Sequence, residues 1–154
     1  MNLNDFAAKL FPFLVRLFCE TGTFTPTLVG SGTAGTFTYS GTGAEYMRVF
    51  GWVVFHGRVN ITATAVAPTG SLSIGGLAIA GASSVVAVAG GAVIYNWSGF
   101  NVAAGYTHVA GQILSGGSSI GIVKNGDNLA SAYVQGSEAA ATVDLQFFGL
   151  YRVG

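Results

Sequence analysis

The sequence predicts an all-β fold, a jelly-roll-like antiparallel sandwich or barrel with a short N-terminal α-helix. Residues 45–66 form the longest stretch in which apolar side chains recur with a period of two. Roughly eight to ten short strand-like runs occur along the chain, with turn residues about every 8–12 positions. From Thr21 onward, Gly, Thr and Ser surround these short apolar runs, a texture typical of β-sheet proteins.

The segment at residues 45–66 is predicted to be an antiparallel hairpin. Gly51 and Trp52 lie where a tight turn would fold residues 45–50 back on the longer strand. Alternation along that strand places apolar residues on one face and polar residues on the other. The face expected to point inward carries Val53, Phe55, Gly57, Val59 and Ile61.

Further strands are predicted between Gly-rich and Pro-rich turns. Asn125 and Gly126 provide the strongest hairpin signal, because an Asn-Gly pair supplies both positive φ values of a type I′ turn. The C-terminal strand alternates its apolar side chains inward, at Val143, Leu145, Phe147, Gly149, Tyr151 and Val153. The other predicted strands are residues 24–29, 36–39, 71–74, 85–88, 92–95, 106–114, 118–123 and 130–134.

The helix is predicted over residues 2–20. Its apolar residues alternate spacings of three and four, the a/d rhythm of a coiled coil, and Pro12 should kink it. Such a helix could pack on the core of its own domain or on another protein, and we favour the second interpretation. Residues 1–21 are thus an assembly or attachment helix, and residues 22–154 are a β-sandwich knob. The attachment stripe consists of Leu3, Phe6, Leu10, Phe13 and Leu17.

Charge is scarce and balanced in this chain. Six basic and six acidic residues make up 8% of the sequence and cancel, which argues against nucleic acid as a partner. No charged residue lies between Arg58 and Lys124, so we expect this uncharged middle to face neighbouring subunits. The uncharged apolar run at residues 10–15 is too short for membrane insertion. Cys19 is the only cysteine, so no internal disulfide or multi-cysteine metal site is possible.

Motifs that would indicate catalysis are weak here. Residues 30–35 match G-x-G-x-x-G, but a β-forming run follows where a nucleotide site needs a helix N-terminus. Residues 117–121 match G-x-S-x-G, but a hairpin follows where a nucleophile elbow needs a helix. His56 and His108 are the only imidazoles. We predict no catalytic residue, no cofactor and no metal site.

Three phrases carry a resemblance to a known family: TFTPTLVG at residues 23–30, PTGSLSIGGLAI at residues 68–79 and LQFFGLYRV at residues 145–153. Together with the aromatic-rich central hairpin, they resemble the β-rich module of tailed-bacteriophage virion proteins. Such modules occur in tail fibres and in the small spikes or fibres that decorate capsids. The resemblance covers residues 22–154. It implies jelly-roll-like subunits that form a homotrimer, with a short N-terminal segment attached to the particle.

Two functions fit this resemblance. The first is capsid decoration, as a cement or head-fibre protein whose helix binds the major capsid protein. The second is a receptor-binding tail-fibre tip that recognises host surface glycans through Trp97 and Tyr106. The first is favoured, because only about twenty residues precede the β module. An enzyme such as a polysaccharide depolymerase would need paired carboxylates, and Glu45 and Glu138 are not an evident pair.

Overall fold

A computed structural model describes residues 19–79, 81 and 88–153. The predicted N-terminal helix and its stripe at Leu3, Phe6, Leu10, Phe13 and Leu17 lie outside these residues, as do residues 85–87 of one predicted strand. The described chain is all-β, apart from a single 3-10 turn, η1 (Gly136–Glu138). The strands are β1 (Cys19–Phe24), β2 (Thr27–Gly30), β3 (Thr36–Tyr39), β4 (Gly43–Val49), β5 (Trp52–Val66), β6 (Leu72–Gly75), β7 (Val88–Phe100), β8 (Tyr106–Leu114), β9 (Ile120–Gly126), β10 (Leu129–Tyr133) and β11 (Ala139–Arg152).

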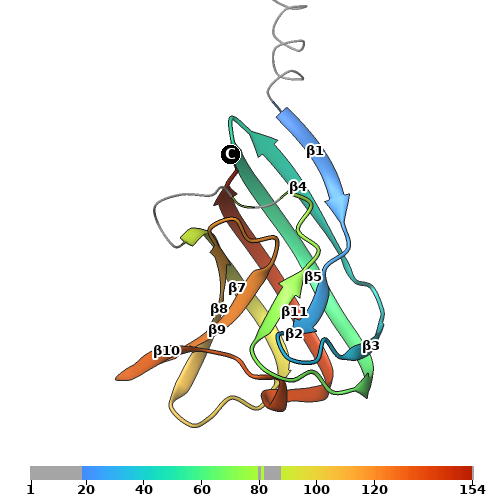
Figure 1. Ribbon diagram of the computed structural model, residues 1–154, viewed down its shortest axis with the longest axis vertical. Coiled ribbons are helices and arrows are strands. Elements are labelled where there is room, and N and C mark those ends of the chain that lie inside the picture. Colours follow the sequence, from blue (N-terminus) through green and yellow to red (C-terminus); the bar gives the residue numbers. More distant parts are fainter. Residues whose placement is uncertain (1–18, 80, 82–87, 154) are drawn as a thin grey trace, which may run out of the picture.

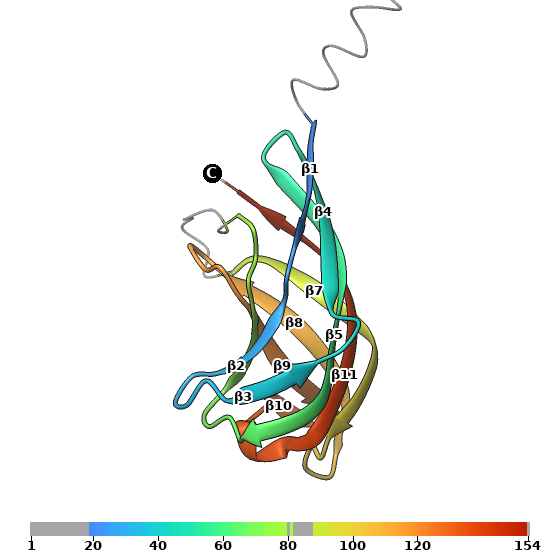
Figure 2. The ribbon, with the colours of Figure 1, turned by 90° about the vertical axis from the view of Figure 1, so that its right-hand side faces the viewer.

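All the described strands belong to one antiparallel sheet. Its order is β1-β4-β5-β11-β7-β8-β9-β6-β2, while β3 pairs with β5 and β10 pairs with β9. Strands β1 and β2 stand at opposite ends of this order, yet only Thr25 and Pro26 separate them in the chain. The sheet therefore has to curl until its two ends approach each other, and it does so as a half-barrel (Figures 1 and 2).

The curled sheet refines the sequence prediction. The all-β class and the antiparallel pairing are confirmed. A jelly-roll sandwich, however, consists of two packed sheets, whereas the described strands follow one continuous hydrogen-bonded path. Alternation of side chains indicates which face of a strand is buried, but it does not say which strands are neighbours, and so it could not distinguish the two arrangements.

The centre of the sheet is the pair β5–β11, where each strand supplies a phenylalanine opposite a glycine of the other. Phe55 pairs with Gly149, and Phe147 pairs with Gly57. A Cβ on Gly149 would overlap the Phe55 ring, and a Cβ on Gly57 would lie 2.8 Å from Phe147 Cζ. Both rings therefore occupy the space that a side chain would take. Phe55 also meets the Tyr151 ring edge-on, with centroids 5.6 Å apart.

Inward-facing residues from the whole sheet form one hydrophobic core. The predicted inward positions of both central strands are confirmed, since Val53, Phe55, Val59 and Ile61 of β5 are at most 1% exposed. Tyr151 is equally buried, and its hydroxyl donates a 2.7 Å hydrogen bond to the Ile79 carbonyl. Strands from the other half of the curl complete the core with Leu28, Leu72, Ile74, Ile113, Ile120 and Ile122.

Two predicted boundaries are corrected near the N-terminus. Strand β1 begins at Cys19, inside the segment predicted as helix, and Glu20 pairs with Arg48 of β4. The predicted strand at residues 24–29 is two strands, broken at Pro26. Proline has no N–H to donate to a ladder, so the chain leaves one edge there and joins the other.

The predicted hairpin after β9 exists, but its turn lies two residues later than expected. Gly126 pairs with Leu129, so the turn residues are Asp127 and Asn128, and Asn128 takes the positive φ of 59°. Gly126 lies in β9, at a position where a Cβ would collide with the Gly105 carbonyl. The glycine that suggested a turn therefore permits a close approach of two backbones.

We expect Gly149→Ala to lower the free energy of unfolding by about 1–3 kcal/mol, because the added methyl forces the Phe55 ring out of its place. Gly43→Ala is the matched control. Gly43 also lies in a strand without positive φ, and a Cβ there meets no atom within 4 Å. Urea unfolding of both variants measures the difference, and equal losses would show that the phenylalanine–glycine pairing is not a packing constraint.

Candidate interaction surfaces

The outward face of β4, β5, β11 and β7 is unusually apolar. On these strands the residues between the core positions point away from the core. Several are large and about half exposed, from 42% for Met47 to 64% for Val93. We call this surface the outer apolar face. Its members are Met47, Trp52, Val93, Tyr95, Phe148 and Leu150.

Strand register brings these side chains next to one another. Met47 is paired with Val54, and Val54 with Leu150. Leu150 is in turn paired with Gly91, and Phe148 with Val93. A shallow groove lies over Gly91, lined by Val93, Phe148 and Leu150. The outer apolar face is thus continuous across four strands and has a depression at its β7 side.

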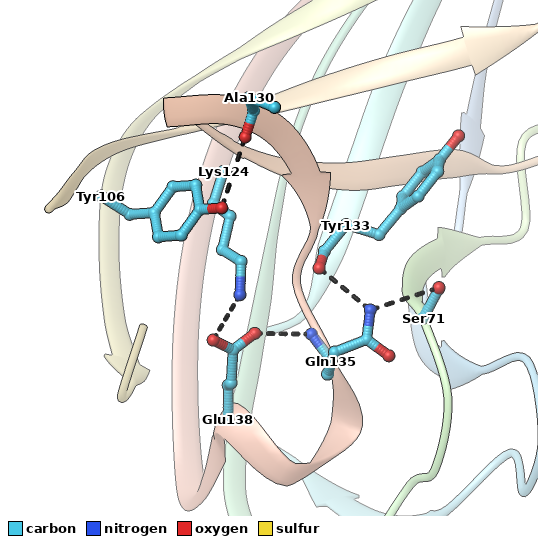
Figure 3. A network of polar contacts seen from close by, with 7 residues as sticks. All are labelled: Ser71, Tyr106, Lys124, Ala130, Tyr133, Gln135 and Glu138. Carbon is cyan, nitrogen blue, oxygen red and sulfur yellow. Dashed lines mark hydrogen bonds and ion pairs between the residues drawn. The ribbon is translucent and has the colours of Figure 1, made fainter. Parts of the chain in front are cut away.

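A second feature is a buried ion pair at the far end of the sheet (Figure 3). Lys124 Nζ on β9 donates to Glu138 Oε1 on η1 at 2.5 Å, and the two side chains are 9% and 13% exposed. Glu138 Oε2 accepts a 2.8 Å hydrogen bond from the backbone N–H of Gln135. The Gln135 amide donates to the Tyr133 carbonyl at 3.0 Å and to Ser71 Oγ at 3.4 Å. This network ties η1 to β9, β10 and the start of β6.

Tyr106, one of the predicted ligand-facing aromatics, belongs to the same network. Its ring lies 4.8 Å from Lys124 Nζ, within range of a cation–π contact. Its hydroxyl donates a 3.3 Å hydrogen bond to the Ala130 carbonyl (Figure 3). The other, Trp97, is partly buried on β7 against the core, with its ring centroid 6.4 Å from that of Phe100. The structure gives both rings packing partners, and glycan contact through them stays a prediction.

The surroundings of Glu138 lower its pKa. Burial alone raises the pKa of this carboxyl, because it penalises the charged form. Hydrogen bonds from Lys124 and from the N–H groups of Gln135 and Ala103, together with the ammonium charge, outweigh that penalty. The pKa of Glu138 therefore lies below its usual value, and this carboxylate stays ionised at neutral pH.

Asp144 and Glu45 also have partners. Asp144 on β11 receives two hydrogen bonds from the Arg58 guanidinium, at 2.8 and 2.9 Å. Glu45 lies 3.6 Å from the His56 ring on the exposed face. Glu45 and Glu138 therefore sit on different elements with different partners, and they do not form a carboxylate pair. Within the described residues, no group of three or more His, Cys, Asp or Glu side chains could hold a metal ion.

The motif-like glycine runs have structural settings that match the sequence interpretation. Residues 30–35 lead into β3 and residues 117–121 lead into β9, so a strand follows each run. His108 Nδ1 lies 2.7 Å from the Thr107 hydroxyl on the surface of β8. In the described part of the chain, no helix has the length and apolar character needed to cross a membrane.

Sequence reasoning missed the outer apolar face. Tyr95 and Phe148 were visible as aromatic residues at outward positions of predicted strands, whereas Trp52 was assigned to the turn and is in fact the first residue of β5. Their significance depends on β11 lying between β5 and β7, which juxtaposes side chains that are distant in the sequence. The signal available from sequence alone was a large apolar residue at positions where a half-buried strand normally carries polar ones.

Among solved structures, the crystal structure of the Dettilon tailspike protein (gp208) has a similar fold. The TM-score is 0.68 and the sequence identity is 20%. The match covers 87% of this chain and 24% of the tailspike chain, so this chain spans about a quarter of that protein. At this identity the likeness concerns the fold. No protein-family model and no curated protein sequence matches the chain.

We expect Glu138→Gln to flatten the acid dependence of stability. Because the folded-state pKa is lowered, the ionised carboxylate contributes stability above the unfolded-state pKa of about 4.3, and this contribution is lost as the pH falls through the folded-state pKa. The variant should be less stable than the wild type at pH 7 and lose less on acidification. Urea unfolding between pH 7 and pH 3 tests this, with the exposed Glu45→Gln as the control. An unchanged acid slope in Glu138→Gln would contradict the prediction.

Proposed function

We propose that this chain is a non-enzymatic structural module of a tailed-bacteriophage virion, located on the tail and assembled as a homotrimer. The observation that carries the proposal is the fold, which matches a tailspike protein over 87% of the chain. The sequence resemblance to virion fibre proteins points to the same setting.

A trimer is supported by the surface of the subunit. The outer apolar face exposes several large side chains together, and contiguous patches of this kind mark interaction sites. Charge is too sparse, at 8% of residues, to make such a surface well solvated. Association with further copies removes the patch from water without any additional protein.

The non-enzymatic part of the proposal is supported by the carboxylates. Glu138 and Asp144 are held in ion pairs with Lys124 and Arg58. Glu20 is bound by the Tyr46 hydroxyl at 3.0 Å. Glycoside hydrolysis normally needs two carboxyl groups facing one bond, and these side chains are directed to separate partners.

Host surface glycan is the ligand class we propose for a tail location, with Trp97 and Tyr106 as the aromatic contacts. Capsid decoration is the second candidate. The observation that favours it is the apolar stripe of Leu3, Phe6, Leu10, Phe13 and Leu17, whose a/d spacing suits attachment to another protein such as the major capsid protein.

Light scattering during size exclusion should give the mass of three chains for the purified protein at micromolar concentration. The physical reason is burial of the outer apolar face. A monodisperse monomer of 15.7 kDa under the same conditions would overturn the trimer.

Antibody labelling of phage particles, viewed by electron microscopy, should place this protein on the tail. Label on the capsid shell would instead support decoration. In that case deletion of residues 1–18, which stops short of β1, or Phe13→Asp, should abolish particle binding and leave β-sheet circular dichroism unchanged. The substitution has this effect if Phe13 is buried in the contact, because an unpaired buried carboxylate is costly.

A further inference from the structure

We infer that three copies of this chain associate through the outer apolar face, with β11 of each copy next to the threefold axis. This inference rests on the proposed homotrimer and identifies the surface that forms it. It concerns Met47 of β4, Val54 of β5, Phe148 and Leu150 of β11, and the groove over Gly91 of β7.

The size of the patch suits such an interface. A large apolar or aromatic side chain offers about 150 Å² or more. Six such side chains, each about half exposed, therefore present roughly 500 Å² of apolar surface. That is near the upper end for the largest patch on a monomer, about 300–600 Å². It also makes up most of the roughly 800 Å² that each partner contributes to a standard interface.

Threefold symmetry determines which parts of the outer apolar face contact each other. Around a threefold axis, one side of a subunit's patch contacts the opposite side of its neighbour, while residues close to the axis meet their own copies. The strand order β4-β5-β11-β7 puts β5 and β11 in the middle of the patch, and β11 carries two of its large exposed side chains, Phe148 and Leu150. We therefore place Phe148 and Leu150 where they meet their own copies, so that the β4–β5 side of one subunit faces β7 of the next.

The two sides of the patch carry side chains of different size. One register row crosses the four strands as Met47, Val54, Leu150 and Gly91. It begins with a long flexible side chain and ends at a glycine whose outward side is a groove. If the threefold axis runs along β11, Met47 of one copy and Gly91 of the next lie at the same height along the axis. An unbranched methionine adapts well to such a depression.

Charge favours a copy of this chain over an unrelated charged partner. No charged residue occurs in the register row from Met47 to Gly91. Charged side chains lie in the two neighbouring rows of this face, where Glu45 Oε2 lies 3.6 Å from His56 Nε2 and Arg152 is paired with Trp52. The row itself therefore offers apolar contact, as suits association with a chain whose own formal net charge is zero.

Cysteine crosslinking tests this geometry in a full-length Cys19→Ser background, which removes the only native thiol. Under mild oxidation, Phe148→Cys should give disulfide-linked dimers from the trimer, because only two of three thiols can pair. Met47→Cys mixed with Val93→Cys, after joint refolding, should give more linked product than either variant alone. Ser131→Cys, exposed on β10 away from this face, is the control and should stay unlinked.

Charge substitution provides the second readout. Phe148→Glu should convert the trimer to a folded monomer, whereas Leu129→Glu should leave it trimeric. Leu129 is the matched control, because it is a similarly exposed large apolar residue on β10. Circular dichroism checks that both variants keep the β fold. If Phe148→Glu does not fold, the crosslinking of Phe148→Cys decides whether this face forms the trimer.

The outcomes separate the two proposals. A trimer that survives Phe148→Glu and shows no Phe148→Cys linkage overturns the assignment of this face but leaves the homotrimer standing. A wild-type monomer in solution overturns both. Disulfide linkage through Ser131→Cys points to another surface and overturns the inference. A Phe148→Cys variant that forms linked dimers but has a native mass of two chains points to a twofold arrangement and also overturns it.

Discussion

The reciprocal phenylalanine–glycine pairing between β5 and β11 is the packing constraint on which the rest of the fold depends. Each ring covers a glycine on the neighbouring strand, so the two strands share one register and one buried layer. Shifting this register by one residue would point Phe55 and Phe147 to solvent and open space in the core. Strand β4 pairs with the other edge of β5, and β7 pairs with the other edge of β11. The β5–β11 pair therefore joins the two halves of the curl and fixes their relative position.

The same two strands also supply much of the outward surface. Their alternation places Phe147 and Tyr151 in the core and sends Phe148 and Leu150 to the opposite face. A strand with large apolar residues on both sides is typical of a sheet that is covered on both sides. In the subunit only the inner side of β11 is covered, and the proposed trimer would cover its outer side.

Sequence reasoning predicted the parts of the structure that depend on local alternation. The inward positions of β5 and β11, the bounds of β3 and β8, and the hairpin between β4 and β5 followed from a period of two. Pro26 and Gly126 show where this reasoning failed. The proline ends one edge strand and starts the opposite one, and the glycine serves a contact with Gly105. Both roles depend on segments that meet only in three dimensions, as do the outer apolar face and the Lys124–Glu138 pair.

The position of β11 has a consequence for how the protein is made. It is the last strand of the described chain to leave the ribosome, yet it belongs between β5 and β7, at the middle of the sheet. Until it is synthesised, those two strands lack a neighbour and the ring of Phe55 has no Gly149 to cover. Contacts between segments so far apart in sequence form slowly, and unpaired strand edges are prone to aggregation. Folding therefore has to wait for β11, and a chain that stops before residue 139 lacks the strand that joins its two halves.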